Sequence, residues 1–548
     1  MSTAASFEVT NLPGLTAATA ATLNGQYAGL LPSSNGSSYF FWYFPTPYAA
    51  ANNSLVVWLN GGPGCSSLEG LFTELGPFQF SKSGVLQANP YSWHLQANML
   101  FIEQPAGVGF NPNGTDATYD EIGLAGYFNT FLNNWFNVFP DAKSKDLYIT
   151  GESYAGTYIP YIATNLIQAK TFKDGSPIKL KGLGIGNPAL GSTGTPVDYF
   201  DFFRDSGFLE KFPADFVAQV GNLTNQCQAG TASNTTDCYI FDTFANQYAL
   251  DPAHTTFGVN NTCPDPYWIT KEYPCDNSFN DAGFVKEGYM SNFLNTPSVQ
   301  AAVHVTGAHI NWNECNYVNL TDSQNAPSNT LLDGIISAGV NVVIYDGDQD
   351  SVCSYVAVER VLGNTTWAGA EGFSTPAQNW VVNGKNSGLL WNDRNLTYVR
   401  LFGPGHMVPG DDPILGSAVL AEALRGSRMP ALNLAVHSGI VSVVTAASST
   451  STASATSLAT SAATSSATSS ATSAAAISIA TTSYVAPSPS IAPASSYTPP
   501  ASPAASYNPA SSVAVSTYAP PQPSNLYKSG AAALLVSAAL AAGLALLF

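Results

Sequence analysis

Ser153 lies in the segment Gly151-Glu152-Ser153-Tyr154-Ala155-Gly156, shortly after the apolar run Leu147-Tyr148-Ile149. A serine in a tight turn between a strand and a helix is held in a strained conformation that presents its hydroxyl to a neighbouring imidazole. Asp350 and His406 follow far downstream. A serine, an aspartate and a histidine in this chain order can form a catalytic triad, so the sequence predicts a nucleophile that makes and breaks acyl bonds.

Asp350 ends the segment 341–350, a β-branched apolar run that breaks at Gly347. This pattern predicts a core strand that delivers a carboxylate to the loop at its C-terminal end. The aspartates of this segment also have the spacing that opens an EF-hand calcium loop. That loop needs glycine at its sixth position and glutamate at its twelfth, where this chain has Ser351 and Ala357. We therefore expect a triad carboxylate here and no metal site.

His406 follows the apolar run 397–402 and a glycine-rich break. Its place after both Ser153 and Asp350 predicts the base of the triad. The remaining histidines lack this context, and we expect them on the surface or hydrogen-bonded in the core: His94, His254, His304, His309 and His437.

A second glycine-rich loop, Asn60–Ser67, follows the strand-like run Leu55–Leu59. Glycines allow backbone N–H groups to approach a reacting carbonyl, so this loop is expected to donate one hydrogen bond of an oxyanion hole and the amide of Tyr154 the other. The loop lacks the lysine and Ser/Thr of a P-loop, which argues against phosphate binding.

Alternating strands and helices predict the architecture that positions these residues. Helical spacing of large apolar residues between 128 and 136 predicts one helix face packed on a sheet. The pattern is typical of an α/β-hydrolase fold, a mostly parallel central sheet with helices on both faces. The region from about 195 to 330 lacks this alternation and is expected to form a cap inserted beside the active-site cleft. The expected strands are 55–59, 99–103, 147–150, 178–184, 341–346 and 397–402.

Over roughly residues 25 to 425 the chain resembles the serine carboxypeptidases, a family of acid-active exopeptidases with the α/β-hydrolase fold. The combination of motifs is highly specific. They are Asn60–Ser67, Asn89-Pro90-Tyr91-Ser92-Trp93, Gln104-Pro105-Ala106-Gly107-Val108-Gly109-Phe110, Gly151–Gly156, Gly347–Asp350 and Gly405-His406-Met407-Val408-Pro409.

The resemblance assigns roles to particular residues. It implies that Ser153, Asp350 and His406 form the triad, and that the oxyanion hole consists of the amides of Gly62 and Tyr154. The groups that bind the terminal carboxylate of the substrate would be Asn60, Glu74 and Glu152. Pocket residues would be Trp58, Met407 and Cys353, the last a free thiol, and Cys65 would pair with Cys315.

Two glutamates facing a substrate carboxylate cannot all remain ionised at close range, so at least one is expected to hold a proton and donate a hydrogen bond. Raising the pH would remove that proton and weaken peptide binding. The expected function is therefore release of single C-terminal amino acids from peptides and proteins at acid pH through an acyl-enzyme on Ser153. Without the resemblance, Glu74 would be interpreted as an exposed helix residue.

Two other functions remain open. The first is an esterase or acyltransferase on the same fold, and the second is a cell-wall glycoprotein with an inert hydrolase domain. Departures from the family pattern bear on substrate preference rather than on the triad: Glu103 stands where aspartate is common, Asn111 where serine is frequent, and Thr157 where histidine is usual.

The seven cysteines leave one unpaired if the others form disulfides. Apart from Cys315, four of them lie in the expected cap, where both 227–275 with 238–263 and 227–238 with 263–275 are open. No C-x-x-C pair supports a zinc site. Dense Asn-x-Ser/Thr acceptors favour a secreted glycoprotein. They are Asn35, Asn52, Asn113, Asn222, Asn234, Asn260, Asn319, Asn364 and Asn395.

Composition divides the chain into further segments. Residues 1–24 form an N-terminal lead with no visible secretory signal, so we expect the true start to lie upstream. Residues 25–430 form the catalytic domain. Residues 431–528, rich in Ser, Thr, Ala and Pro, predict a disordered, O-glycosylated stalk. Residues 529–548 predict a GPI-attachment signal that is removed, and hence tethering to the plasma membrane or cell wall, with a transmembrane helix as the alternative.

The chain has 36 acidic and 18 basic residues and a net charge of −18. This balance argues against nucleic-acid binding. The expected partners are peptide and protein C-termini, with membrane contact only through the lipid anchor. The mechanism requires no cofactor and no metal.

Overall fold

The computed structural model describes residues 2–34, 36–112, 120–191, 193–232, 238, 240–249, 262–274, 282–305, 311–316, 318, 320, 326–425 and 433–444. The predicted stalk beyond residue 444 and the predicted attachment signal lie outside the described residues. So do His254, His309, Cys275 and the acceptors Asn35, Asn113, Asn234, Asn260 and Asn319.

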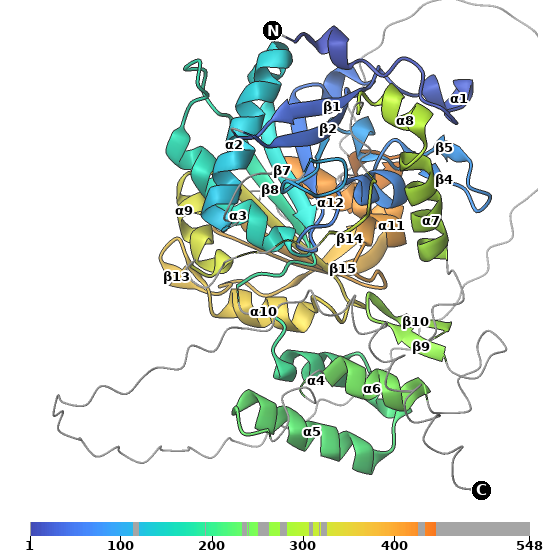
Figure 1. Ribbon diagram of the computed structural model, residues 1–548. Coiled ribbons are helices and arrows are strands. Elements are labelled where there is room, and N and C mark those ends of the chain that lie inside the picture. Colours follow the sequence, from blue (N-terminus) through green and yellow to red (C-terminus); the bar gives the residue numbers. More distant parts are fainter. Residues whose placement is uncertain are drawn as a thin grey trace, which may run out of the picture. The chain divides into compact units, whose positions relative to one another are not determined.

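A 12-stranded sheet forms the centre of the described chain (Figure 1). Its order is β1-β2-β6-β3-β7-β8-β11-β16-β15-β14-β17-β18. The pairings from β6 through β16 are all parallel, whereas the strands on either side pair mostly antiparallel. In sheet order the strands are β1 (Tyr27–Pro32), β2 (Ser38–Phe44), β6 (Asn98–Ile102), β3 (Ser54–Leu59), β7 (Asp146–Glu152), β8 (Leu180–Gly186), β11 (Asn341–Gly347), β16 (Leu396–Leu401), β15 (Lys385–Asp393), β14 (Gln378–Val382), β17 (Asn433–His437) and β18 (Ile440–Val444).

The six strands expected from the sequence are confirmed as β3, β6, β7, β8, β11 and β16. They are the parallel centre of the sheet, where both faces are buried and the sequence runs are nearly continuously apolar. Because parallel strands end at the same edge, the loops that follow β3, β7, β11 and β16 meet there. Those loops contain the predicted site residues.

Helices cover both faces of the sheet, as predicted. Side chains alternate along β3, so that Leu55 and Val57 belong to one core while Val56 and Trp58 belong to the other. The first core packs against α2 (Glu121–Val138), α3 (Ala155–Ala169) and α9 (Leu332–Ser337). The second packs against α12 (Pro413–Arg425), which follows the short α11 (Val408–Asp411). The expected apolar face of α2 is fully buried: Phe128, Phe131, Leu132, Trp135 and Phe136.

The expected cap consists of two parts that pack differently. Helices α4 (Pro196–Asp205), α5 (Ala214–Gln228) and α6 (Ile240–Ala249) share a separate aromatic cluster that includes Phe203 and Phe244. In contrast, α7 (Ala282–Leu294) and α8 (Pro297–Ala302) bury Met290 and Val299 in the second sheet core. The cap therefore comprises α4, α5, α6 and the following segment 262–274, whose Ile269 joins the same cluster, whereas α7 and α8 are part of the main domain.

A bidentate ion pair joins the cap helices to the main domain. Arg360, on α10 (Tyr355–Gly363), donates from Nε and Nη2 to Asp198 on α4, at 2.7 and 2.8 Å. The hairpin β9 (Thr262–Asp265) and β10 (Trp268–Pro274) adds contacts described below. The smaller elements are α1 (Ala17–Ala20), the hairpin β4 (Phe78–Phe80) with β5 (Leu86–Ala88), and the pair β12 (Thr366–Trp367) with β13 (Ala370–Glu371).

Two expected boundaries of the catalytic domain are wrong. Residues before 25 are part of the fold, because Phe7, Val9 and Leu12 are buried in its two cores. The stalk does not begin at residue 431, because β17 and β18 extend the sheet to residue 444. Composition alone misplaced the second boundary because a short apolar strand within a Ser/Ala-rich context is recognised only through its pairing with β14.

Cysteine pairing selects one of the alternatives in the cap. Cys227 is bonded to Cys238, as in the second of the two arrangements, and Cys263 is also in a disulfide. Among the described residues, no helix has the length and apolar content needed to cross a bilayer. Over the same residues, no group of three or more His, Cys, Asp or Glu has the arrangement of a metal site.

Candidate active site

Ser153 occupies a strained turn between β7 and α3. Its φ of 61° places a non-glycine residue in the left-handed region. Backbone bonds hold this conformation: the Ser153 N–H donates to the Gly186 carbonyl at 3.0 Å, and its carbonyl accepts from Gly156 and Ala189, both at 2.9 Å. A Cβ at Gly151 would lie 2.2 Å from the Leu59 carbonyl oxygen. A glycine two residues before the serine is therefore required by the close approach of β3.

Asp350 and His406 form a buried hydrogen-bonded pair, with His406 Nδ1 2.6 Å from Asp350 Oδ2. A carboxylate only accepts, so Nδ1 bears the proton and Nε2 is left as an acceptor. Asp350 also accepts from the Asn187 side chain at 2.9 Å and from the backbone N–H of Val352 at 2.7 Å. The carboxylate is thus fixed by several donors, and the imidazole is held in the tautomer that a general base needs.

The pKa of His406 is raised. Burial lowers it, but the charge and hydrogen bond of Asp350, with further contributions from Glu74 and Asp411, outweigh that effect. Asp411 accepts from the Gly405 N–H at 2.8 Å, and burial raises the pKa of this carboxyl to about 7. The electrostatics of the site therefore favour an imidazole that takes up a proton readily.

The cap hairpin lies against both loops of this pair. His406 N–H donates to the Tyr267 carbonyl at 2.8 Å, and the two rings are 5.1 Å apart between centroids. The Ser351 N–H, next to Asp350, donates to the Pro266 carbonyl at 3.1 Å. The turn between β9 and β10 consequently orders the aspartate and histidine loops together.

Cys353 connects the nucleophile to the pair. Its thiol is buried and free of disulfide, and it hydrogen-bonds Ser153. Its backbone N–H donates to Asp350 Oδ2 at 3.2 Å. Burial raises the pKa of the thiol, and the charges of Asp350 and Asp346 raise it further, so the group stays protonated. Ser153, Cys353, Asp350 and His406 thus belong to one contiguous set of contacts.

The glycine-rich loop after β3 lies directly against the serine turn. A Cβ at Gly61 would be 2.4 Å from the Tyr154 nitrogen and 2.7 Å from Ser153 Cβ. Gly62 has φ 109°, a conformation that other residues rarely adopt. The loop is tied down by the disulfide Cys65–Cys315, with S–S 2.02 Å. Only glycine allows this backbone to approach the nucleophile so closely.

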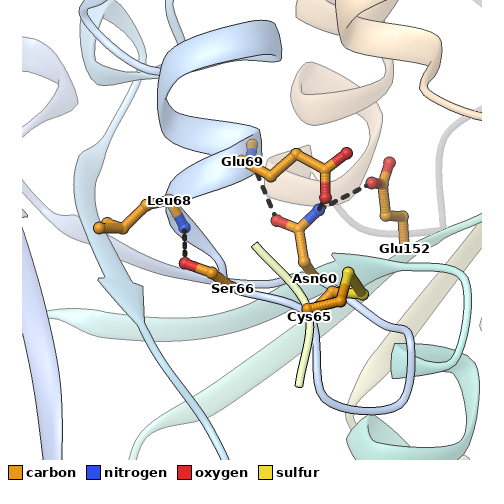
Figure 2. The surroundings of a disulfide bond; sticks show 8 residues. Asn60, Cys65, Ser66, Leu68, Glu69 and Glu152 are labelled. Atoms are coloured by element: carbon orange, nitrogen blue, oxygen red, sulfur yellow. Dashed lines mark hydrogen bonds between the residues drawn. A yellow bond between two sulfur atoms is a disulfide. The ribbon is translucent and has the colours of Figure 1, made fainter. Parts of the chain in front are cut away.

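A network of carboxyl groups lies beside the loop (Figure 2). Asn60 sits between two of them, its Nδ2 donating to Glu152 Oε1 at 3.0 Å and to Glu69 Oε2 at 3.3 Å. Trp58 Nε1 donates to Asn60 Oδ1 at 2.7 Å and orients the amide. Glu74 is 3% exposed, so it is not the surface residue that its local sequence suggested. It ends the π-helix Gly70–Glu74.

The pKa of Glu152 is raised well above its ordinary value. Burial is the largest cause, followed by the charges of Glu74 and Glu69, a hydrogen bond with Glu74, and the charge of Asp411. Neighbouring buried carboxyls can hydrogen-bond each other only if one is protonated. The network therefore holds at least one proton at acid pH, and with Asn60 it offers donors to an anionic group.

The remaining predicted residues are placed as follows. Met407 is half-buried next to His406, and Trp58 is fully buried. Asn52, Asn222 and Asn364 are exposed and Asn395 is half-buried.

His94 is buried against Ser92 with its pKa lowered to about 4 by burial, and His437 is exposed. His304 Nδ1 contacts the Ala28 carbonyl at 3.0 Å.

Sequence reasoning missed Asn187, Tyr267 and Glu69. Asn187 carries a weak signal, because it directly follows the strand β8 next to the strand of the serine. Tyr267 contributes through its backbone carbonyl, which no residue type reveals. Glu69 joins the network only because the chain turns into a helix at Gly70.

A family model described as serine carboxypeptidase matches residues 13–426. A pheromone-processing carboxypeptidase kex1 of Penicillium rubens is 33% identical over 431 residues, 75% of this chain and 70% of the relative. The pheromone-processing carboxypeptidase kex1 of Aspergillus terreus is 32% identical over 427 residues, which cover 75% of this chain and 67% of the relative. The crystal structure of Kex1(Δ)p, a prohormone-processing carboxypeptidase from Saccharomyces cerevisiae, superposes with a TM-score of 0.66 at 25% identity, covering 81% of this chain and 100% of that one.

Proposed function

The chain belongs to the serine carboxypeptidase family, and we propose that it uses Ser153, Asp350 and His406 to release single amino acids from peptide C-termini at acid pH. The observation that carries this assignment is the 2.6 Å hydrogen bond between His406 and Asp350, formed by loops that meet at the serine turn. No cofactor enters the proposed mechanism.

The first step is capture of the free C-terminus. Asn60 and the protonated member of the Glu74 and Glu152 pair donate hydrogen bonds to the terminal carboxylate. Charge-assisted hydrogen bonds of this kind are stronger than neutral ones. Because the network adjoins the glycine-rich loop, a bound C-terminus places the last peptide carbonyl at Ser153, and internal peptide bonds do not reach it.

Attack on the peptide bond follows. Ser153 Oγ adds to the carbonyl carbon as His406 Nε2 takes its proton, while Asp350 holds the imidazole and stabilises its charged form. The developing oxyanion receives hydrogen bonds from the amides of Gly62 and Tyr154. The imidazolium then protonates the leaving amine, the terminal amino acid departs, and water hydrolyses the acyl-enzyme by the same route.

The pH dependence of substrate affinity tests the carboxylate site. The pKa of Glu152 is raised, so the neutral, donating form predominates below the shifted pKa and is lost as the pH rises through it. We expect the KM for a blocked dipeptide to rise by at least about tenfold between about pH 5 and about pH 8, because an ionised Glu152 repels the substrate carboxylate. Steady-state kinetics across this range measures the effect.

Glu152→Gln is the matched variant, since its amide donates at every pH. We expect its KM to be nearly constant over the same range. A dipeptide with an amidated C-terminus is the substrate control and should be turned over poorly at all pH values, whereas an esterase would accept it. A wild-type KM that does not change with pH contradicts the assignment of the network.

We also propose that the enzyme is tethered at the cell surface by a lipid on its C-terminal segment. The disulfides Cys65–Cys315 and Cys227–Cys238 support passage through an oxidising compartment, as do the exposed acceptors Asn52, Asn222 and Asn364. Treating intact cells with a phosphatidylinositol-specific phospholipase should release the carboxypeptidase activity into the medium. Activity that stays with the cells after treatment contradicts the lipid anchor, and buffer-treated cells give the baseline.

A further inference from the structure

Glu103 is a fully buried carboxyl that the proposed mechanism does not use. It follows β6 directly, and the side chain has no exposed surface. We propose that Glu103 is a positioning residue that holds the oxyanion loop, residues 61–67, in the geometry required for transition-state stabilisation. The proposal rests on the proposed role of the Gly62 and Tyr154 amides.

Three donors from separate segments converge on this carboxyl. Ser66 Oγ and Trp312 Nε1 both donate to Oε1, the latter at 3.1 Å, and the Phe110 N–H donates to Oε2 at 2.5 Å. Ser66 belongs to the oxyanion loop, Phe110 to the turn after β6, and Trp312 to the segment that leads to Cys315. Since a glutamate has two acceptor oxygens, a single side chain fixes all three segments relative to one another.

The loop is held most directly through Ser66. Besides donating to Glu103, the Ser66 hydroxyl accepts from the Leu68 N–H at 3.2 Å, as Figure 2 shows. The backbone N–H of Ser66 donates to the Glu314 carbonyl at 2.7 Å. The Gly64 carbonyl accepts from Asn316 N–H at 2.9 Å. Glu103 and the 312–316 segment thus hold the loop through Ser66 and Gly64.

The turn after β6 is shaped to admit this carboxyl. Gly109 has φ 52°, and a Cβ there would lie 1.9 Å from Glu103 Oε1. Asn316 Nδ2 donates to the Gly107 carbonyl at 2.7 Å and joins this turn to the segment behind the loop. Burial raises the pKa of Glu103 to about 7, against the lowering effect of its three donors.

Loop position matters because the Gly62 amide must point at the developing oxyanion. A misplacement of about 1 Å can cost about 100-fold in rate, and loss of one oxyanion donor costs about 10²- to 10³-fold. The substrate carboxylate is bound by other side chains, so a displaced loop lowers kcat more than it raises KM.

Three variants test the proposal. In Glu103→Ala all three contacts are lost, and we expect kcat for a blocked dipeptide to fall by about 30- to 100-fold with KM within about threefold. Ser66→Ala removes the contact between Glu103 and the loop, together with the acceptor of the Leu68 N–H, and should lower kcat by about tenfold. Trp312→Phe keeps an aromatic ring and removes the donor remote from the loop, so its effect should be smaller. Rates are expressed per active site titrated with a fluorophosphonate, which removes unfolded enzyme from the count.

Glu422→Gln is the control. Glu422 also accepts a hydrogen bond from a tryptophan indole, that of Trp380 at 3.2 Å, but Trp380 lies on β14 and not beside the oxyanion loop. It should keep kcat per titrated site while losing some thermal stability. A peptide aldehyde, which places an oxyanion in the hole, should bind Glu103→Ala and Ser66→Ala more weakly, by the same factor as the loss of kcat. If both variants keep wild-type kcat per site, or if they lose kcat while binding the aldehyde normally, the positioning role is wrong. Reaction of wild-type Ser153 with the fluorophosphonate would still support the proposed function in either case.

Discussion

Replacing Ser153 by alanine is expected to lower kcat/KM for a blocked dipeptide by about 10⁶-fold. The acyl-enzyme cannot form without the hydroxyl, and the rate that remains comes from binding and the oxyanion hole alone. The loss should appear in kcat, with KM nearly unchanged, because the groups that bind the terminal carboxylate are untouched. Release of the C-terminal amino acid at acid pH, followed by chromatography, measures both constants.

Ser206→Ala is the matched control for this change. Ser206 caps the end of α4 in the cap, outside the contacts that join the nucleophile to the pair. Its kcat/KM should equal that of the wild type. An alanine variant at 153 that retains more than about a thousandth of the wild-type rate would exclude this serine as the nucleophile.

Asp350→Asn is expected to lower kcat/KM by about 10⁴-fold. Asp350 accepts from the imidazole, from the Asn187 side chain and from backbone N–H groups. An amide in its place must turn an N–H group toward one of these donors, and it stabilises the wrong tautomer of His406. The raised pKa of His406 should also fall, because the charge of Asp350 is its main source of elevation. The pH profile of kcat/KM reports both effects.

Asp348→Asn is the control in the same loop. Asp348 Oδ1 accepts from the Gly403 N–H at 2.8 Å, and asparagine retains a carbonyl oxygen that can do the same. Its kcat/KM should stay within about threefold of the wild type. Similar losses in the two variants would mean that the effect at 350 is structural rather than electrostatic.

The centre of the fold could be predicted from the sequence because its strands are apolar on both faces and end in glycine or polar breaks. The outer strands could not. The segment Ser38–Phe44 is equally buried on nearly every residue, but its place at the side of the parallel centre depends on antiparallel pairing with β1 and β6. Residues 433–444 fall within the stalk that composition predicts, since only non-local pairing distinguishes them from their surroundings.

Within the site, chain order together with the apolar run and break before each residue predicts the three members of the proposed triad. Glu74 is predicted by the resemblance and not by the local pattern. The sequence of a helical turn does not reveal whether its glutamate is buried, because burial depends on how the chain packs. The Asn187 side chain and the Tyr267 carbonyl could not be predicted. They contact Asp350 and His406 only after β8, β11 and the cap hairpin have assembled.

The most direct test is the identity of the acylated residue. A blocked depsipeptide keeps the free terminal carboxylate but has an ester at the scissile position, so acylation is fast and the intermediate accumulates for acid quenching. Digestion after lysine and arginine yields the fragment 146–170. Mass spectrometry of this fragment should show the acyl group on Ser153, and amidating the terminal carboxylate should abolish it. An adduct on another residue, or one formed equally with the amidated compound, would contradict the account.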